Sequence, residues 1–200
     1  MKDRSSVSRF ARRIALASVL VLGLSSLSTS VWAYPPGQNL TVTSQKATVM
    51  KGRMFYFLLN KAQPGPVSVT LNGVTVGGTA GGDGKATVMI PAKSYGIFLA
   101  TAKSGSETAT TRVYVPSFTL LNTRGETVYA GRRGHFLAVK VYGVKFGTVV
   151  TVLADSKLYF NTAWTTSIAK VKFQVPNNPG SSTIVVNLMG QNKTIPYTIN

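Results

Sequence analysis

The sequence predicts an all-β protein that contains two similar antiparallel β-sandwich domains, and three observations support this fold class. Apolar and polar residues alternate with a period of two over much of the chain after Tyr34, as in strands buried on one face. Glycine, proline, asparagine and aspartate interrupt this alternation at short intervals, which is typical of turns between short strands. The order of strands and turns then occurs twice. No sustained helical periodicity competes with this interpretation.

The first 33 residues have the composition of a cleaved secretion signal. A basic start precedes an apolar run from Ile14 to Leu24, and small or short residues at Val31 and Ala33 predict cleavage before Tyr34. A retained membrane anchor is the alternative, but the run is shorter than the ~20 apolar residues that a spanning helix needs. We therefore expect an exported protein, secreted or held non-covalently at the cell wall, with no transmembrane segment in the mature chain.

The charge is strongly basic and belongs mostly to the mature chain. The 200 residues include 22 Lys and Arg against 5 Asp and Glu, a net charge of +17. Residues 1–33 hold five of the basic residues and one acidic residue, so residues 34–200 keep 17 and 4, a net charge of +13. The chain has no cysteine, which excludes disulfides, thiolate metal sites and cysteine nucleophiles.

The internal repeat predicts a first domain over residues 34–116 and a second over residues 117–200. Each copy is about 80 residues long, near the size of a seven-strand sandwich. Matching segments are Thr48–Arg53 with Thr127–Arg132, Val67–Leu71 with Val149–Leu153, Val88–Pro91 with Phe173–Pro176, and Gly105 with Gly190.

Individual segments fit strands and turns in order along the chain. Met54–Leu59 is apolar on both faces, so we expect another part of the protein to cover its outer face; an exposed apolar patch is the alternative. Residues Gly77–Gly84 predict a flexible hairpin tip. In Lys170–Val175, the alternation places Val171, Phe173 and Val175 inside and Lys170, Lys172 and Gln174 outside.

The first copy resembles the bacterial immunoglobulin-like repeats of secreted and surface proteins. Its segment Gly65–Gly73 has the proline-glycine corner that precedes a strand, and Gly82–Pro91 has the Asp-Gly turn that enters a strand ending in proline. The resemblance covers residues 40–115 and is fainter in the second copy, where Thr162–Ser167 replaces the Asp-Gly turn. It implies an antiparallel sandwich with a spacer, adhesive or binding role, and it carries no catalytic residues.

The residues that catalysis or metal binding would need are scarce. His135 is the only histidine, and its neighbours Arg132 and Arg133 would repel a metal cation. The acidic residues of the mature chain, Asp83, Glu107, Glu126 and Asp155, are scattered along the sequence and fit turns and loops better than a carboxylate pair or a calcium site. We expect no enzymatic activity, no cofactor and no resident metal.

The second copy contains many basic residues, with aromatic residues near them in the sequence, and we expect them to form a basic surface. Such a surface predicts contact with anionic cell-wall polymers or polysaccharide, with nucleic acid bound only non-specifically. A carbohydrate-binding or adhesin-like module that uses the aromatic side chains is the second hypothesis. Lysines that serve solubility alone are the third interpretation; a protein partner and the oligomeric state stay open. The candidate residues are Arg132, Arg133, Lys140, Lys145, Lys157, Lys170, Lys172, Tyr142, Tyr159 and Trp164.

Overall fold

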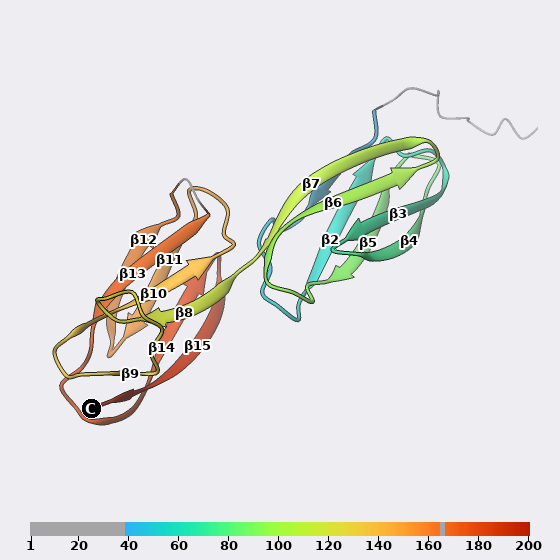
Figure 1. The fold of residues 1–200 in the computed structure, drawn as a ribbon. Helices are drawn as coiled ribbons and strands as arrows, with labels where there is room; N and C mark the ends of the chain where they lie inside the picture. Colours follow the sequence, from blue (N-terminus) through green and yellow to red (C-terminus); the bar gives the residue numbers. More distant parts are fainter. Residues whose placement is uncertain (1–38, 165–166) are drawn as a thin grey trace, which may run out of the picture. The chain divides into compact units, whose positions relative to one another are not determined.

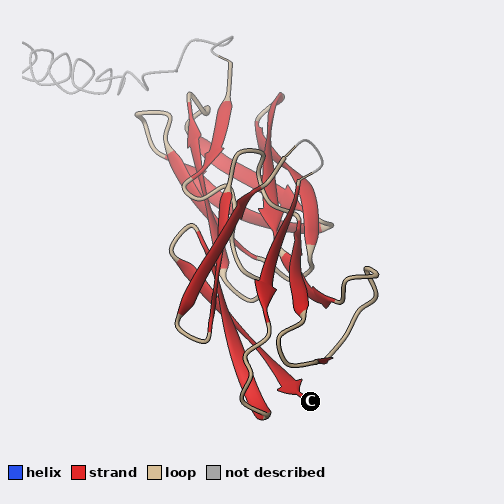
Figure 2. Ribbon diagram, turned by 90° about the vertical axis from the view of Figure 1, so that its left-hand side faces the viewer, coloured by secondary structure: helices blue, strands red, loops and turns tan. Residues whose placement is uncertain are grey.

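The computed structural model describes residues 39–164 and 167–200, and this part of the chain consists of strands and loops without a helix (Figures 1 and 2). The secretion signal and its cleavage site lie outside the described residues. The predicted all-β fold is confirmed, and the strands form two sandwiches of two sheets each.

The first sandwich packs a sheet of order β1-β2-β5 against a sheet of order β4-β3-β6-β7. All its strand pairs are antiparallel. The first, second and fifth strands therefore form one layer, as in the immunoglobulin fold, and the fourth strand pairs with the third in the other layer. The strands are β1 (Thr41–Ser44), β2 (Met54–Asn60), β3 (Gly65–Leu71), β4 (Val74–Ala80), β5 (Ala86–Pro91), β6 (Gly96–Ser104) and β7 (Glu107–Val115).

The second sandwich repeats this topology with one short additional strand. Its sheets have the orders β13-β10-β8 and β12-β11-β14-β15-β9, and only the β15–β9 pair is parallel among the named strands. The strands are β8 (Ser117–Leu121), β9 (Ala130–Gly131), β10 (Phe136–Tyr142), β11 (Val149–Ala154), β12 (Lys157–Thr162), β13 (Ile168–Gln174), β14 (Gly180–Leu188) and β15 (Gln191–Ile199). Only Pro116 separates β7 from β8; the domain limits 34–116 and 117–200 stay a prediction.

Two separate hydrophobic cores hold the sandwiches together. In the first core, Phe55 and Phe57 of β2 are fully buried, with their ring centroids 5.8 Å apart. In the second core, the ring of Phe173 packs in T-shaped arrangements with the rings of Tyr159 and Tyr197, at centroid distances of 6.3 and 6.0 Å. Burying one aromatic side chain of this kind stabilises a fold by roughly 1.5–3 kcal/mol.

The hydrogen bonds before β2 and β10 correct the sequence alignment of the two copies. The N–H of Gly52 donates to Ala92 O, and the N–H of Gly134 donates to Val175 O, at 2.9 and 3.1 Å. Both glycines have a positive φ, 88° and 69°, which a turn at that point requires. Gly52 thus corresponds to Gly134 and not to Gly131, so the sequence match of Thr48–Arg53 with Thr127–Arg132 is wrong by three residues. The repeat itself is confirmed by the common strand order.

Two expectations about the first sandwich are also wrong. The glycine-rich segment is not a hairpin tip throughout, because Gly77 and Gly78 lie within β4 and pair with β3. A Cβ on Gly78 would lie 3.1 Å from a methyl carbon of Val88, so glycine there permits close packing. The outer face of β2 is not covered either, because Met54 and Tyr56 remain 38% and 42% exposed.

Candidate functional site

The outer face of the β13-β10-β8 sheet gathers four of the ten predicted site residues, Lys140, Tyr142, Lys170 and Lys172. Residues on β10 and β13 alternate between the core and this face: Val139 and Val171 are buried between the sheets, whereas Lys140, Lys170 and Lys172 are exposed. The predicted inward and outward residues of Lys170–Val175 are confirmed. We call the residues that the strand register places on this side of the sheet the ladder face, and of these Leu121 and Ala138 are buried. They are Ser117, Thr119, Leu121, Phe136, Ala138, Lys140, Tyr142, Ile168, Lys170, Lys172 and Gln174.

The strand register places three lysines side by side at the centre of the ladder face. Lys140 lies directly opposite Lys170, and Ala138 lies opposite Lys172 in the next row. Successive outward residues of one strand are about 6.7 Å apart, and directly opposed residues are about 5 Å apart. The three lysines therefore occupy two neighbouring rows, where a row is one pair of residues that oppose each other across β10 and β13.

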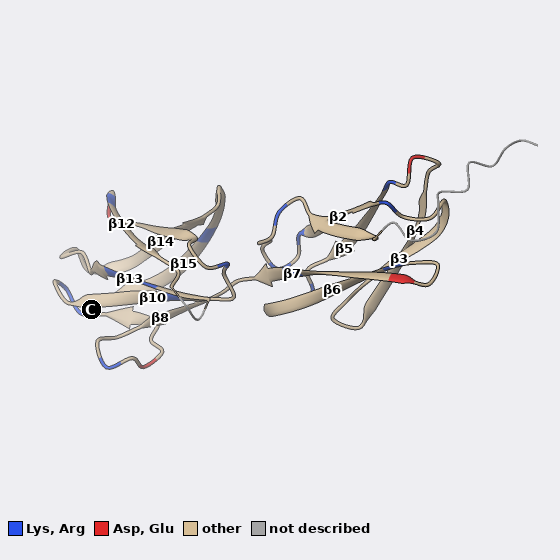
Figure 3. Ribbon diagram, turned by 90° about the horizontal axis from the view of Figure 1, so that it is seen from above, with Lys and Arg blue, Asp and Glu red and all other residues tan. Residues whose placement is uncertain are grey.

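No carboxylate neutralises these lysines within the described residues. The one ion pair there joins Lys85 and Asp83, 3.9 Å apart, in the first sandwich. The acidic residues lie in turns or at a strand end (Figure 3), namely Asp83, Glu107, Glu126 and Asp155. Like charges directly opposite each other across a sheet are destabilising, so the Lys140–Lys170 pair opposes folding unless an anion lies between the two side chains.

Aromatic side chains lie at both ends of the lysine rows. Phe136 begins β10 and is 53% exposed, and Tyr142 ends it and is 42% exposed. Tyr142 is paired with Ile168, and Ile168 also bridges to Trp164, which is 63% exposed. A ligand that extends along β10 would therefore meet an aromatic ring, the cations and a second aromatic ring in that order.

A shallow cavity of about 370 Å³ lies on the ladder face. Its wall includes Asn122 and Thr123, from the turn that follows β8. Asn122 orders this turn, because its Oδ1 accepts from the N–H groups of Arg124 and Glu126 at 2.9 and 3.0 Å, and its Nδ2 donates to the Glu126 carboxylate at 2.6 Å. The remaining lining residues are Phe136, Leu137, Ala138, Lys170 and Lys172.

The other predicted site residues lie away from the lysine rows. Arg132 and Arg133 are exposed in the connection between β9 and β10, Lys145 is exposed in the loop after β10, and Lys157 begins β12. Tyr159 is half-buried and packs its ring against Phe173 in the second core, so its ring serves packing. The structure brings together Lys140, Tyr142, Lys170 and Lys172, with Trp164 at the margin.

Sequence reasoning missed three contributors to this surface. Phe136 is the first residue of the alternating segment that holds Lys140 and Tyr142 on the same face, and that spacing could have indicated it. Asn122 and Thr123 gave no such signal, because their place beside Lys170 and Lys172 follows from chain folding alone.

The described residues provide no group of three or more His, Asp or Glu side chains that could hold a metal ion. His135 is exposed before β10, and its backbone carbonyl accepts from the N–H of Val175 at 2.8 Å. Within the same part of the chain, no helix has the length and hydrophobicity needed to cross a membrane. The absence of enzymatic activity stays a prediction.

The topology and the two cores define this chain as a tandem immunoglobulin-like β-sandwich protein. The sequence matches no protein-family model and no curated protein. Among solved structures, the chain is similar to the D0–D1 domain of intimin, with 17% identity over 80% of this chain and 98% of that chain and a TM-score of 0.32.

Two other solved structures are similar over larger proteins. One is FdeC, an adhesin of Escherichia coli, with 13% identity over 82% of this chain and 65% of that chain and a TM-score of 0.37. The other is invasin, a bacterial integrin-binding protein, with 10% identity over 81% of this chain and 39% of that chain and a TM-score of 0.34. Similarities of this size say nothing about a ligand, so a function has to come from the residues of this chain.

Proposed function

We propose that the mature protein is a non-enzymatic, secreted or cell-surface immunoglobulin-like protein that binds anionic envelope polymers through the ladder face. The observation that carries this proposal is the cluster of Lys140, Lys170 and Lys172 in two adjacent rows, without a carboxylate partner in the described chain. The net charge of +13 over residues 34–200 draws polyanions toward the protein, and the cluster gives them a place to bind.

The shape of the site favours a polymer over a small anion. The three lysines lie on the open face of a sheet, where water screens each charge and a single ion pair contributes little. A polymer with repeated negative charges can contact all three ammonium groups at once, and its binding also releases the counterions that it carries. The sum of several weak contacts then gives useful affinity, which falls steeply with salt.

The exposed aromatic rings support a second candidate function, binding of neutral carbohydrate. Phe136, Tyr142 and Trp164 each leave a large part of the ring accessible, and an aromatic face can pack against the apolar face of a ring-shaped ligand. Binding of this kind depends on apolar contact and persists at high salt, whereas polyanion binding does not.

Sedimentation of the mature protein with purified bacterial cell walls and with heparin beads tests both functions. We expect binding at low salt that is lost at high salt, and a triple variant K140Q/K170Q/K172Q that stays in the supernatant. Absence of binding by the wild-type protein at low salt refutes the proposal. Binding that ignores salt but is lost in F136A/W164A supports the carbohydrate function instead.

A further inference from the structure

Strand β4 is the outermost strand of the β4-β3-β6-β7 sheet, and one of its edges pairs with no other described strand. Proteins usually protect such an edge with charged residues or proline, because its unpaired N–H and C=O groups can pair with another chain. The sequence of β4, Val-Thr-Val-Gly-Gly-Thr-Ala, contains neither a charged residue nor a proline. The edge of β4 therefore lacks the usual protection.

The corresponding edge strand of the second sandwich, β12, has such protection. It begins with Lys157. The side chain of Asn161 donates to Lys170 O on β13 and accepts from the N–H of Thr162, both at 2.8 Å, so it covers part of this edge. Because β4 and β12 have the same place in the sheet order, the open edge of β4 does not follow from the fold alone.

The strand register identifies the free backbone groups of β4. Opposed residues of an antiparallel pair alternate between hydrogen-bonded and non-hydrogen-bonded pairs, and the two residues that flank the turn Asn72-Gly73 form a bonded pair. Counted from that turn, the N–H and C=O groups of Thr75, Gly77 and Thr79 point away from β3. Pro66, which has no N–H, lies opposite Thr79 as this alternation requires.

These groups on β4 are accessible. Thr75, Gly77 and Thr79 are exposed, and no other described group forms a hydrogen bond with their backbone. A Cβ on Gly77 would have only Val67 O within 4 Å, at 3.8 Å, so the space beside it is open. Glycine inside a strand often marks a place where another backbone approaches closely.

The order of residues along this edge is self-complementary. If a second copy of β4 pairs antiparallel with Gly77 opposite the partner's Gly77, each Thr75 lies opposite the partner's Thr79. Threonine pairs across a ladder are favourable. No side chain of β4 carries a charge, whereas the net charge of +13 over residues 34–200 makes two copies repel each other at charged surfaces. A second copy therefore matches this edge in register, side chains and charge.

We propose that two copies of this protein form an antiparallel dimer through the edge of β4. Thr75, Gly77 and Thr79 exchange backbone hydrogen bonds with the second copy, and the two four-stranded sheets become continuous. An interface built on one strand pair is small, so we expect a dissociation constant in the micromolar range or weaker. The inference does not rest on the proposed function, because β4 and the ladder face belong to different sandwiches.

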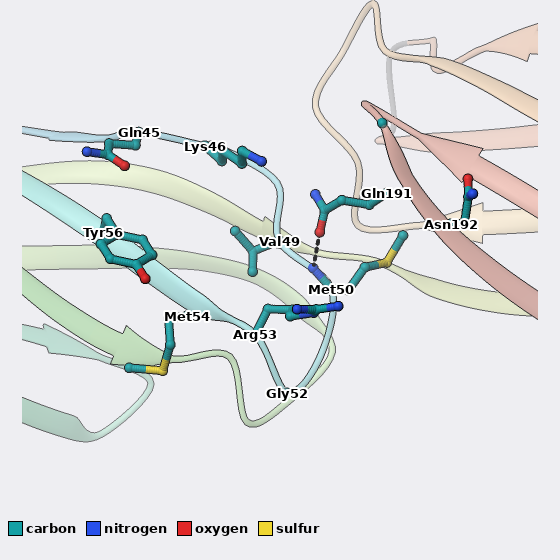
Figure 4. Close-up of a pocket in the computed structure, with 11 residues that line it drawn as sticks. Gln45, Lys46, Val49, Met50, Gly52, Arg53, Met54, Tyr56, Gln191 and Asn192 are labelled. Carbon is teal, nitrogen blue, oxygen red and sulfur yellow. Dashed lines mark hydrogen bonds between the residues drawn. The ribbon is translucent and has the colours of Figure 1, made fainter.

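The other layer of the first sandwich offers an alternative surface for self-association. Met54 and Tyr56 lie on the outer face of β2 (Figure 4), and Met89 on β5 is 51% exposed. Contact through these apolar side chains needs no free backbone group. The variant Y56S/M89S removes much of this apolar surface and leaves β4 unchanged, so it separates the two modes of contact.

Analytical ultracentrifugation of the mature protein from about 1 µM to about 1 mM measures dimer formation. We expect the mass of a monomer at the lowest concentration and a mass that approaches twice this value at the highest. Because salt screens the repulsion between the copies, dimerisation should strengthen as salt rises, whereas polyanion binding by the ladder face should weaken. A monomer at every concentration overturns the proposal, and so does dimerisation that weakens with salt.

Charge variants locate the contact. T75K/T79K should weaken dimerisation about tenfold or more, because it places two pairs of like charges opposite each other in the dimer. T41K/T43K adds the same charge to β1 in the other layer and should weaken dimerisation much less. Y56S/M89S should leave it unchanged. Equal weakening by the two lysine variants, or a monomeric Y56S/M89S, refutes pairing through β4.

Crosslinking tests the register, and the chain has no cysteine of its own. The Cα atoms of a hydrogen-bonded pair are about 5.5 Å apart, which a disulfide can span, so G77C should form a covalent dimer when copper phenanthroline catalyses its oxidation by air. S68C is the control, because Ser68 lies opposite Gly77 on the inner strand β3, and it should stay monomeric. Equal crosslinking of both variants, or none in G77C, contradicts the pairing.

Discussion

The salt dependence of polyanion binding gives the sharpest test of the ladder face. If Lys140, Lys170 and Lys172 each contact one phosphate of a single-stranded oligonucleotide, each contact adds about 0.7 to the slope of log K against log salt concentration. The variant K140Q/K170Q/K172Q should therefore lower that slope by about 2. Between 50 and 200 mM salt, the three contacts account for a loss of affinity of roughly 20-fold in the wild type, which the variant should not show.

Fluorescence anisotropy with a labelled oligonucleotide measures this slope, with the oligonucleotide serving only as a probe of known charge. The matched control is K145Q/K157Q/K193Q, which removes the same charge from exposed positions of the same sandwich. We expect the control to lower the slope by less than half as much. An equal decrease of the slope in both variants would mean that the net charge of the sandwich, and not the ladder face, determines binding. An unchanged slope in K140Q/K170Q/K172Q would show that the ladder face does not contact the oligonucleotide.

Three further predictions concern stability. K170E turns the Lys140–Lys170 pair into an opposite-charge pair, so urea unfolding at low salt should show a gain of about 0.2–1 kcal/mol that shrinks at high salt; a loss of stability contradicts the register. F173A should destabilise the second sandwich by about 3–5 kcal/mol in the same assay, because Phe173 is fully buried, and a loss below about 1 kcal/mol speaks against this core. Burial raises the pKa of Tyr197 above 10.0. As pH rises through about 10, Tyr197 therefore loses its proton in the unfolded state before it does so in the folded state. The free energy of unfolding falls over this range until the pH reaches the folded pKa. Y197F should abolish that decrease between pH 9 and 11. The buried hydroxyl of Tyr197 has no hydrogen-bond partner among the described residues, so Y197F should also raise the free energy of unfolding by about 1 kcal/mol at neutral pH. Parallel pH profiles of the two proteins contradict this reasoning.

The fold could be predicted from local pattern because the period-two alternation determines which face of a strand is buried. The segment from Lys170 to Val175 shows this most clearly, since each of its residues faces the side that the sequence predicts. The pattern fails where glycine replaces the alternating residues, as at Gly77 and Gly78. The side chain of glycine is a hydrogen atom, so its polarity does not indicate which face of a strand is buried. From the sequence pattern alone, a paired strand at these glycines cannot be distinguished from a turn.

The candidate site was predictable only in part, because it depends on pairing between distant segments. The alternation places Lys170 and Lys172 on one face, but only the register of β10 with β13 places Lys140 opposite Lys170. The same limit explains why Tyr159, close in sequence to other aromatic residues, belongs to the core.

The two sandwiches carry different side chains at matching outward positions of the same layer. Where the second has Lys140, Lys170 and Lys172, the strand registers of the first have Leu58, Thr87 and Met89. The inward neighbours are apolar in both copies. The outward residues can thus differ between the copies while the interior stays apolar. If the ladder face binds polyanions as proposed, transplanting the three lysines onto the first copy should give a chain with two such faces.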